Sequence, residues 1–213
     1  MTATPIDLAT WDRAETFRFF RTFQQPHFAI TARVDVTKIM AAKAANGTNL
    51  FRACLWALGA GLNASPDLRT RFDGDTVTQF DRIDVSPVVS MPDGAFRFAY
   101  IPWDPDWATF DARAEAIIAD VRAGSGLNPD ESATLGVGYL SAVPWIDFTS
   151  LTNAKPGPED CIPRVAWGKI APKGDGPDPI YDMAVSVELH HAVADGRHAG
   201  QFFDATQDAA LTF

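Results

Sequence analysis

The residues best suited to chemistry are two adjacent histidines, His190 and His191, which precede Asp195 and Gly196. They follow the alternating apolar stretch 183–189, so they lie where a strand opens into a loop before a helix, a place where α/β sheets bind ligands. A histidine there is suited to act as a general base because its free pKa is near neutrality. Asp195 can cap the helix or form an ion pair that holds the loop. Gly196 permits backbone conformations that other residues resist.

Two other interpretations of these residues stay open. Both histidines could be hydrogen-bonded structural residues, with Asp195 as a plain N-cap. A metal site is the other alternative, but no further run with zinc-ligand spacing accompanies the histidines, so no metal is expected. The cysteines, Cys54 and Cys161, have no CxxC spacing and are expected to be buried and reduced.

The segments that must position this motif combine strand and helix patterns. Residues 27–36 alternate strictly, as in a half-buried strand, and residues 49–63 are apolar on nearly every side, as in a buried helix. Asp-Gly pairs between apolar runs indicate hairpins. No composition shift marks a linker, so residues 1–213 are expected to form one domain of mixed α/β class, a mixed sheet packed by helices. Further strands are expected over 68–72, 76–80, 82–91, 95–101, 136–142, 163–171 and 180–190, further helices over 38–45, 107–123 and 195–209, and loops over 150–160 and 172–179.

Composition excludes several classes of protein. The 213 residues are 46% hydrophobic and 21% charged, which is globular rather than disordered. The net charge of −9 disfavours nucleic acid and anionic membranes as partners. No apolar run approaches the roughly 18 residues of a membrane span, and the first residues lack the pattern of a secretory signal. A cytoplasmic location is therefore expected.

The HHxxxDG pattern resembles the signature of CoA-dependent acyltransferases, and the rest of the chain resembles one branch, the chloramphenicol acetyltransferase family. The matching segments occur in the family's order over almost the whole length. They are Trp11-x-Arg13-x-Glu15-x-Phe17-x-Phe19, Phe28-x-Ile30-Thr31, Asp35-Val36-Thr37, Asn63 with Pro66-Asp67-Leu68-Arg69, Ser141-Ala-Val-Pro144-Trp145-x-x-Phe148, Lys169 and the motif itself.

The resemblance implies the two-layer sandwich of CoA-dependent acyltransferases, a homotrimer and active sites between subunits. It implies that His191 is the base that deprotonates an acceptor hydroxyl, which then attacks acetyl-CoA, a co-substrate, directly. Ser141 would stabilise the oxyanion. An ion pair between Asp195 and Arg13 would hold the catalytic loop, and His190 and Gly196 would support it. No permanently bound cofactor is implied.

The resemblance also assigns residues to the two substrate sites. Without it, Ser141 would be taken for a turn residue, Arg13 for a solvated helix charge and the aromatic residues for core. The implied acceptor-binding residues are Phe19, Phe20, Phe28, Phe96 and Leu151, and the implied CoA-binding residues are Trp145, Phe51 and Lys169.

Several positions differ from the family. Ala166 replaces a threonine, Phe20 replaces a pocket tyrosine, and Asn153 replaces a pocket leucine. On the CoA side, Asn49 and Phe51 replace a lysine and a tyrosine, and Ile170 replaces another tyrosine. The pattern suggests retained acyl-transfer chemistry with a different acceptor.

The leading hypothesis is therefore an acetyl-CoA-dependent O-acetyltransferase that acts on chloramphenicol or a related small hydroxylated molecule. The alternatives are an acyltransferase of the lipoamide or condensation type, and a non-catalytic trimeric ligand-binding protein of the same fold.

Overall fold

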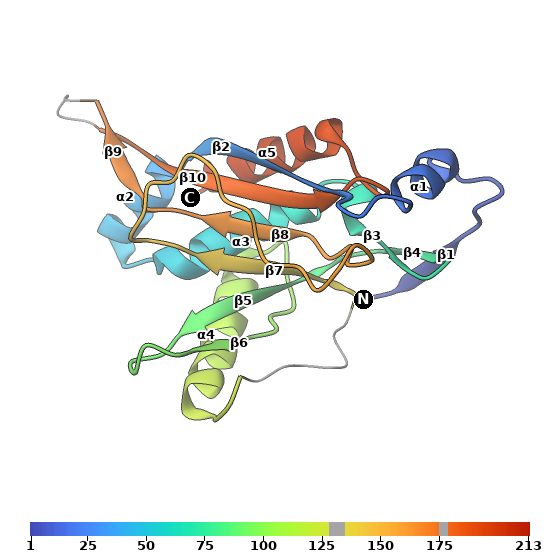
Figure 1. Ribbon diagram of the computed structural model, residues 1–213. Coiled ribbons are helices and arrows are strands. Elements are labelled where there is room, and N and C mark those ends of the chain that lie inside the picture. The colour runs from blue at the N-terminus through green and yellow to red at the C-terminus, as the bar shows by residue number, and fades with distance from the viewer. Residues whose placement is uncertain (128–134, 175–178) are drawn as a thin grey trace.

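A computed structural model describes residues 1–127, 135–174 and 179–213 (Figure 1). In these residues the chain forms a seven-stranded sheet and a three-stranded sheet. The large sheet has the order β2-β10-β8-β7-β5-β6, and β9 also pairs with β10. Its strands are β2 (His27–Asp35), β10 (Ile180–His190), β8 (Arg164–Trp167), β7 (Val137–Ala142), β5 (Asp84–Ser90), β6 (Phe96–Phe98) and β9 (Ala171–Lys173).

The large sheet is mixed. β7 runs parallel to both β5 and β8, whereas the other pairs are antiparallel. Helices pack against one face, and on the other a long connection after β7 crosses the strands (Figure 1). This arrangement confirms the predicted mixed α/β class. The helices are α1 (Ala14–Phe20), α2 (Thr37–Asn46), α3 (Leu50–Leu62), α4 (Trp107–Ala123) and α5 (Gly196–Ala210).

The core lies between the helices and the sheet because alternate strand residues point to it. Val185, Val187 and Leu189 of β10 are all buried in this core. The predicted buried helix is α3, and Asn49 caps its start because the Asn49 side chain accepts a hydrogen bond from the Arg52 N–H. α3 and α5 pack closely at Gly61, where an added Cβ would lie 2.1 Å from Thr206 Oγ1.

The three-stranded sheet forms a second, smaller core beside the histidine motif. It has the order β1-β4-β3, with β1 (Ala3–Ile6), β4 (Thr76–Phe80) and β3 (Thr70–Asp73). Phe17 of α1 and Phe72 of β3 pack with Ala192 and Val193, which follow the two histidines. Cys161 also lies in this cluster, and both cysteines are free and buried, as predicted. Apolar contacts in this smaller core therefore support the loop that follows the two histidines.

Some predicted boundaries were wrong. The strand over 163–171 is interrupted, because Gly168 N–H bonds back to Ala184 while Lys169 N–H bonds to Ile146. The strand over 68–72 begins only at Thr70, after a 3-10 turn (η1, Asp67–Arg69). In the loop expected over 172–179, residues 172–173 belong to β9 and residues 175–178 lie outside the described residues. No described helix has the length and apolarity that crossing a membrane requires.

Candidate active site

His191 lies at the end of β10 in an aromatic surround. Its backbone N–H donates to the Pro26 carbonyl at 2.9 Å. Its ring stacks on Phe20, with centroids 3.9 Å apart and planes 5° from parallel, and it lies 4.9 Å from Phe28. Nδ1 is buried without a hydrogen-bond partner among the described residues. Nε2 is therefore the nitrogen that a substrate can reach. The contacts with Phe20 and Phe28 fix the orientation of the His191 ring.

His190 is held differently. Its side chain is buried, and both ring nitrogens are engaged: Nδ1 accepts from the Ala192 N–H at 3.1 Å, and Nε2 lies 2.8 Å from the Pro158 carbonyl. This pattern places the proton on Nε2, which donates to Pro158. Burial lowers the pKa of His190 to about 4 despite that hydrogen bond, so the ring is neutral at pH 7. His190 has no nitrogen left for a metal or a substrate.

Asp195 has both of the interactions considered for it. Its Oδ2 accepts from Arg13 Nη1 at 2.9 Å, and its Oδ1 accepts from the Arg197 N–H at 3.0 Å, capping α5. Burial works to raise the Asp195 pKa, but the hydrogen bond from Arg13 and the neighbouring His198 outweigh it and the pKa is lowered. Gly196 is the first residue of α5.

Two residues that sequence reasoning missed complete this network. His198 Nδ1 accepts from the Asp195 N–H at 3.0 Å, and its Nε2 lies 3.4 Å from Asp67 Oδ2. Asp67 also lies 3.8 Å from Arg13 Nε. Arg13, Asp67, Asp195 and His198 therefore form a ring that ties α1 and η1 to the start of α5. The spacing Asp195-x-x-His198, a capping box, was the signal for His198.

Ser141 lies in a pocket on the face of the sheet opposite the helices. The pocket has a volume of about 450 Å³, which is in the range of small-molecule sites. It was not predicted, although strand alternation puts its polar residues on one face. Its lining residues are Ser86, Val88, Phe98, Tyr100, Tyr139, Leu140, Ser141, Asn153, Ala154, Arg164 and Val165.

Ser141 and His191 lie far apart within one chain. Ser141 of β7 pairs with Ala166 of β8, which pairs with Ser186 of β10. His191 comes five positions after Ser186, about 16 Å further along at roughly 3.3 Å per residue, and β10 is two strands away from β7. His191 does not line the Ser141 pocket. One small molecule therefore cannot contact His191 and Ser141 of the same chain at once in this structure.

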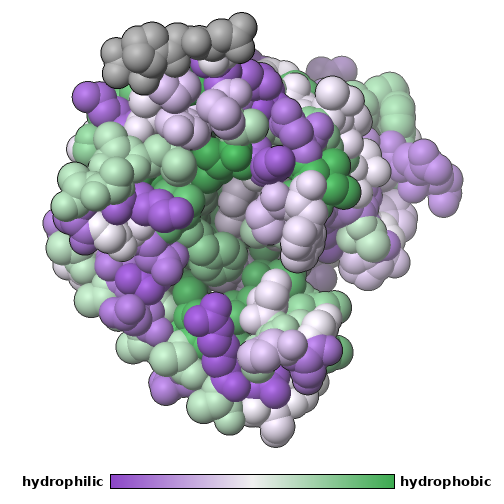
Figure 2. All heavy atoms as spheres, turned by 90° about the vertical axis from the view of Figure 1, so that its left-hand side faces the viewer, coloured by the Kyte–Doolittle hydropathy of each residue, from purple (hydrophilic) through white to green (hydrophobic). Residues whose placement is uncertain are grey.

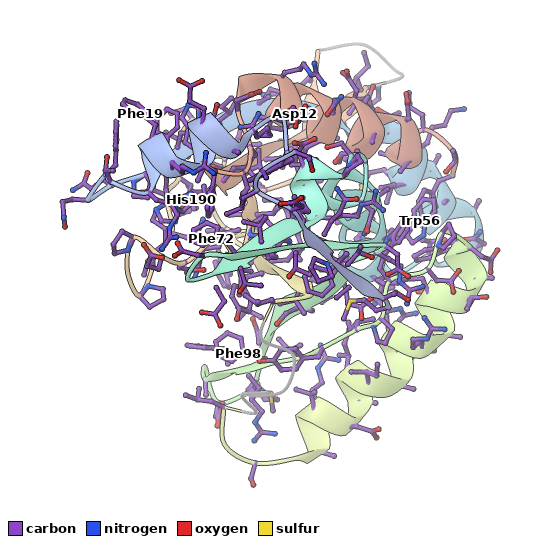
Figure 3. All side chains as sticks on the ribbon, turned by 90° about the vertical axis from the view of Figure 1, so that its right-hand side faces the viewer. Asp12, Phe19, Trp56, Phe72, Phe98 and His190 are labelled. Carbon is purple, nitrogen blue, oxygen red and sulfur yellow. The ribbon has the colours of Figure 1, made fainter. Side chains whose placement is uncertain are left out.

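The predicted acceptor-binding residues divide between these two places. Phe20 and Phe28 contact the His191 ring, and Phe19, which is 58% exposed, contacts Phe20. Phe96 instead packs against Phe98 at the Ser141 pocket, with centroids 5.7 Å apart. In Figure 3, Phe19 lies above and Phe98 below on the same side of the view, with His190 and Phe72 between them.

Leu151 lies on the connection that crosses the helix-free face. It packs against a small cluster that contains Phe148, Ala166 and Ala184. Its carbonyl accepts a hydrogen bond from Ser186 Oγ at 2.8 Å. Leu151 therefore lies over β8 and β10, near the Ser141 pocket but not in its lining.

The predicted CoA-binding residues gather at the end of the molecule where β7 ends. Phe51 packs against Trp167, with ring centroids 5.6 Å apart, and Lys169 is exposed beside Ile146, whose carbonyl accepts its N–H at 2.9 Å. Trp145 is 76% exposed. Figure 2 views this end and shows a hollow with apolar side chains on its walls.

Comparison with known proteins decides the family. The sequence model for chloramphenicol acetyltransferase matches residues 1–207. The chain belongs to the chloramphenicol acetyltransferase family. This is a family of acyltransferase enzymes. The chain is 27% identical to chloramphenicol acetyltransferase 2 of Escherichia coli, with 97% of this chain and 96% of that protein covered. It is 28% identical to a chloramphenicol acetyltransferase of Staphylococcus aureus, with coverages of 95% and 93%.

Solved structures agree with this assignment. A chloramphenicol acetyltransferase superposes with a TM-score of 0.88 at 29% identity, and the match covers 98% of this chain and 99% of that one. A dihydrolipoamide acetyltransferase of Azotobacter vinelandii has a TM-score of 0.65 at 18% identity, with coverages of 92% and 86%. The second likeness shows the shared fold of CoA-dependent acyltransferases alone.

Proposed function

We propose that this chain transfers an acetyl group from acetyl-CoA to a hydroxyl of chloramphenicol or a related small hydroxylated molecule. Membership of the family supports acetyl transfer, and the open nitrogen of His191 in an aromatic surround supports a base that acts on an apolar acceptor. The end of the molecule that carries Phe51, Trp145 and Lys169, where β7 ends, would receive acetyl-CoA.

The proposed mechanism uses two residues of the chain. His191 Nε2 removes the proton of the acceptor hydroxyl as the oxygen forms a bond to the thioester carbonyl carbon. The Ser141 hydroxyl donates a hydrogen bond to the oxyanion that develops, an interaction typically worth about 3 kcal/mol in the transition state. The intermediate collapses with cleavage of the C–S bond, and the thiolate takes the proton from His191. The products are the O-acetyl ester and free CoA.

The separation of His191 from Ser141 carries the proposal that the site forms between two copies. In a closed ring such as a homotrimer, the His191 side of one copy would face the Ser141 pocket of the next. Exposed aromatic residues at the His191 side fit this arrangement, because Phe19 is 58% and Phe23 39% exposed there. A second copy would cover apolar surface that a lone chain leaves in water.

Mixing two inactive variants tests this proposal. His191→Ala and Ser141→Ala should each lose at least 100-fold in thiol release from acetyl-CoA with chloramphenicol as acceptor. When the two are refolded together, each interface in a ring has a one-in-two chance of receiving each intact residue, so about one quarter of wild-type activity should return. Each variant refolded alone is the control.

Two results would contradict the proposal at different points. Mixtures that stay as inactive as their parents would place the whole site within one chain. Wild-type protein that releases no thiol over a panel of hydroxylated acceptors would overturn the acetyltransferase activity and favour ligand binding without catalysis.

A further inference from the structure

The wall of the Ser141 pocket carries hydroxyl groups beyond the one that the proposed chemistry requires, among them those of Ser86 and Tyr139. Ser86 of β5 pairs in register with Tyr139 of β7, and Ser141 follows Tyr139 by two positions on the same face of the sheet. All three residues line the pocket. Only Ser141 has a proposed role in the reaction, so the other two hydroxyls need an explanation.

Neither hydroxyl is used by the fold as the structure describes it. Ser86 is 1% exposed, and its Oγ has no hydrogen-bond partner among the described residues. Buried hydroxyls are normally paired, and an exception at a pocket wall points to a ligand. The Tyr139 hydroxyl makes no hydrogen bond to another described residue either. Burial raises the pKa of Tyr139, so its hydroxyl stays protonated and can donate.

The charge balance of the pocket indicates a neutral ligand. Arg164 is the charged residue in its lining, and Nη2 of Arg164 lies 2.5 Å from Asp160 Oδ2 in an ion pair. Arg164 also lies over the Tyr139 ring, 5.2 Å from the centroid. The arginine is thus balanced and held within the wall, so a carboxylate or phosphate on the acceptor would find no unpaired cation there.

We propose that Ser86 and Tyr139 are specificity-determining residues that bind a second hydrogen-bonding group on a neutral acceptor. This inference rests on the proposed function. Ser86 and Ser141 are one strand apart and offset by two residues, so the second group would lie about 8 Å from the reacting hydroxyl. A site built to hydrogen-bond a substrate group rejects analogues that lack it far more strongly than an apolar pocket does.

Two small alcohols that differ by one hydroxyl test this proposal. 2-(4-Hydroxyphenyl)ethanol carries a phenolic hydroxyl at the far end of its ring, at a comparable distance from its primary hydroxyl, whereas 2-phenylethanol lacks it. Thiol release from acetyl-CoA should give wild-type protein a kcat/KM at least 10-fold higher for the hydroxylated alcohol. Ser86→Ala and Tyr139→Phe should each bring this ratio to within 3-fold of one.

A matched control is Ser90→Ala, on the same strand and the same face as Ser86 but exposed and outside the pocket. It should keep the wild-type ratio. Equal kcat/KM for the two alcohols in wild-type protein, an unchanged ratio in both pocket variants, or acetylation of chloramphenicol but of neither alcohol would overturn this inference and leave the proposed function standing. No thiol release with any of the three acceptors would overturn both.

Discussion

The charge of Asp195 can be removed without removing its cap. Asn and Asp are equally good N-caps, so Asp195→Asn keeps the hydrogen bond to the Arg197 N–H and loses only the ionic bond to Arg13. Asp195→Ala loses both. Comparing the two substitutions, each with and without Arg13→Ala, separates the ion pair from the helix cap.

The expected magnitudes follow from exposure. Breaking a fully buried pair costs about 3–5 kcal/mol, but the Asp195 side chain is 37% exposed although that of Arg13 is only 13% exposed. Solvent screening therefore reduces the coupling between them to about 1 kcal/mol. The cap adds about 1 kcal/mol. We expect the free energy of unfolding to fall by about 1 kcal/mol for Asp195→Asn and about 2 kcal/mol for Asp195→Ala.

Urea unfolding at one fixed protein concentration measures these free energies, because assembly would make stability depend on concentration. Losses for Arg13→Ala and Asp195→Asn that add to within about 0.3 kcal/mol would refute the ion pair. The pH dependence provides a second check. The pKa of Asp195 is lower in the folded chain than in the unfolded one, so the coupling should be complete above about pH 4 and disappear as pH falls through the folded pKa.

Three further substitutions address the histidine loop and the helix packing. His190 has a pKa near 4 when folded against 6.5 when unfolded, so wild-type stability should fall as pH decreases from 6.5 towards 4. The free energy of unfolding of His190→Ala, measured with urea, should depend less on pH than that of the wild-type protein. The same pH dependence in both proteins would contradict the low pKa of His190 in the folded chain. Gly61→Ala should lower the free energy of unfolding by about 1–3 kcal/mol because its Cβ would overlap Thr206. Gly200→Ala in α5, with no atom within 4 Å, should instead gain up to about 1 kcal/mol, and equal shifts in Tm would argue against the close packing.

Local patterns predicted most of the large sheet and its helices. The alternation over 27–36 and the uniform apolarity of 49–63 are properties of the segments themselves, and both appear as expected in β2 and α3. β1 was not predicted because its four residues are mostly exposed and take strand form by pairing with β4. The interruption at Gly168 depends on partners more than 15 positions away, Ala184 and Ile146, which no local pattern reveals.

Less of the candidate site than of the fold could be predicted from the sequence. The HHxxxDG motif indicated His191 directly, because its residues are neighbours in the chain. The Ser141 pocket depends on register among four strands and on which face the helices leave uncovered, and neither can be derived from alternation alone. The distance between His191 and Ser141 has the same origin, since it depends on how β7, β8 and β10 align.

The alternation along β5 has a consequence for how this protein could diverge. Val85 and Val89 of β5 pack into the helix-covered core, whereas Ser86 and Val88, which alternate with them, line the pocket. Core positions and pocket positions thus alternate along this strand but lie on opposite faces of the sheet. Substitutions at the pocket positions change the ligand environment while the core packing stays intact. If the pocket binds the acceptor as proposed, single substitutions there would exchange one acceptor for another while the core packing stays intact.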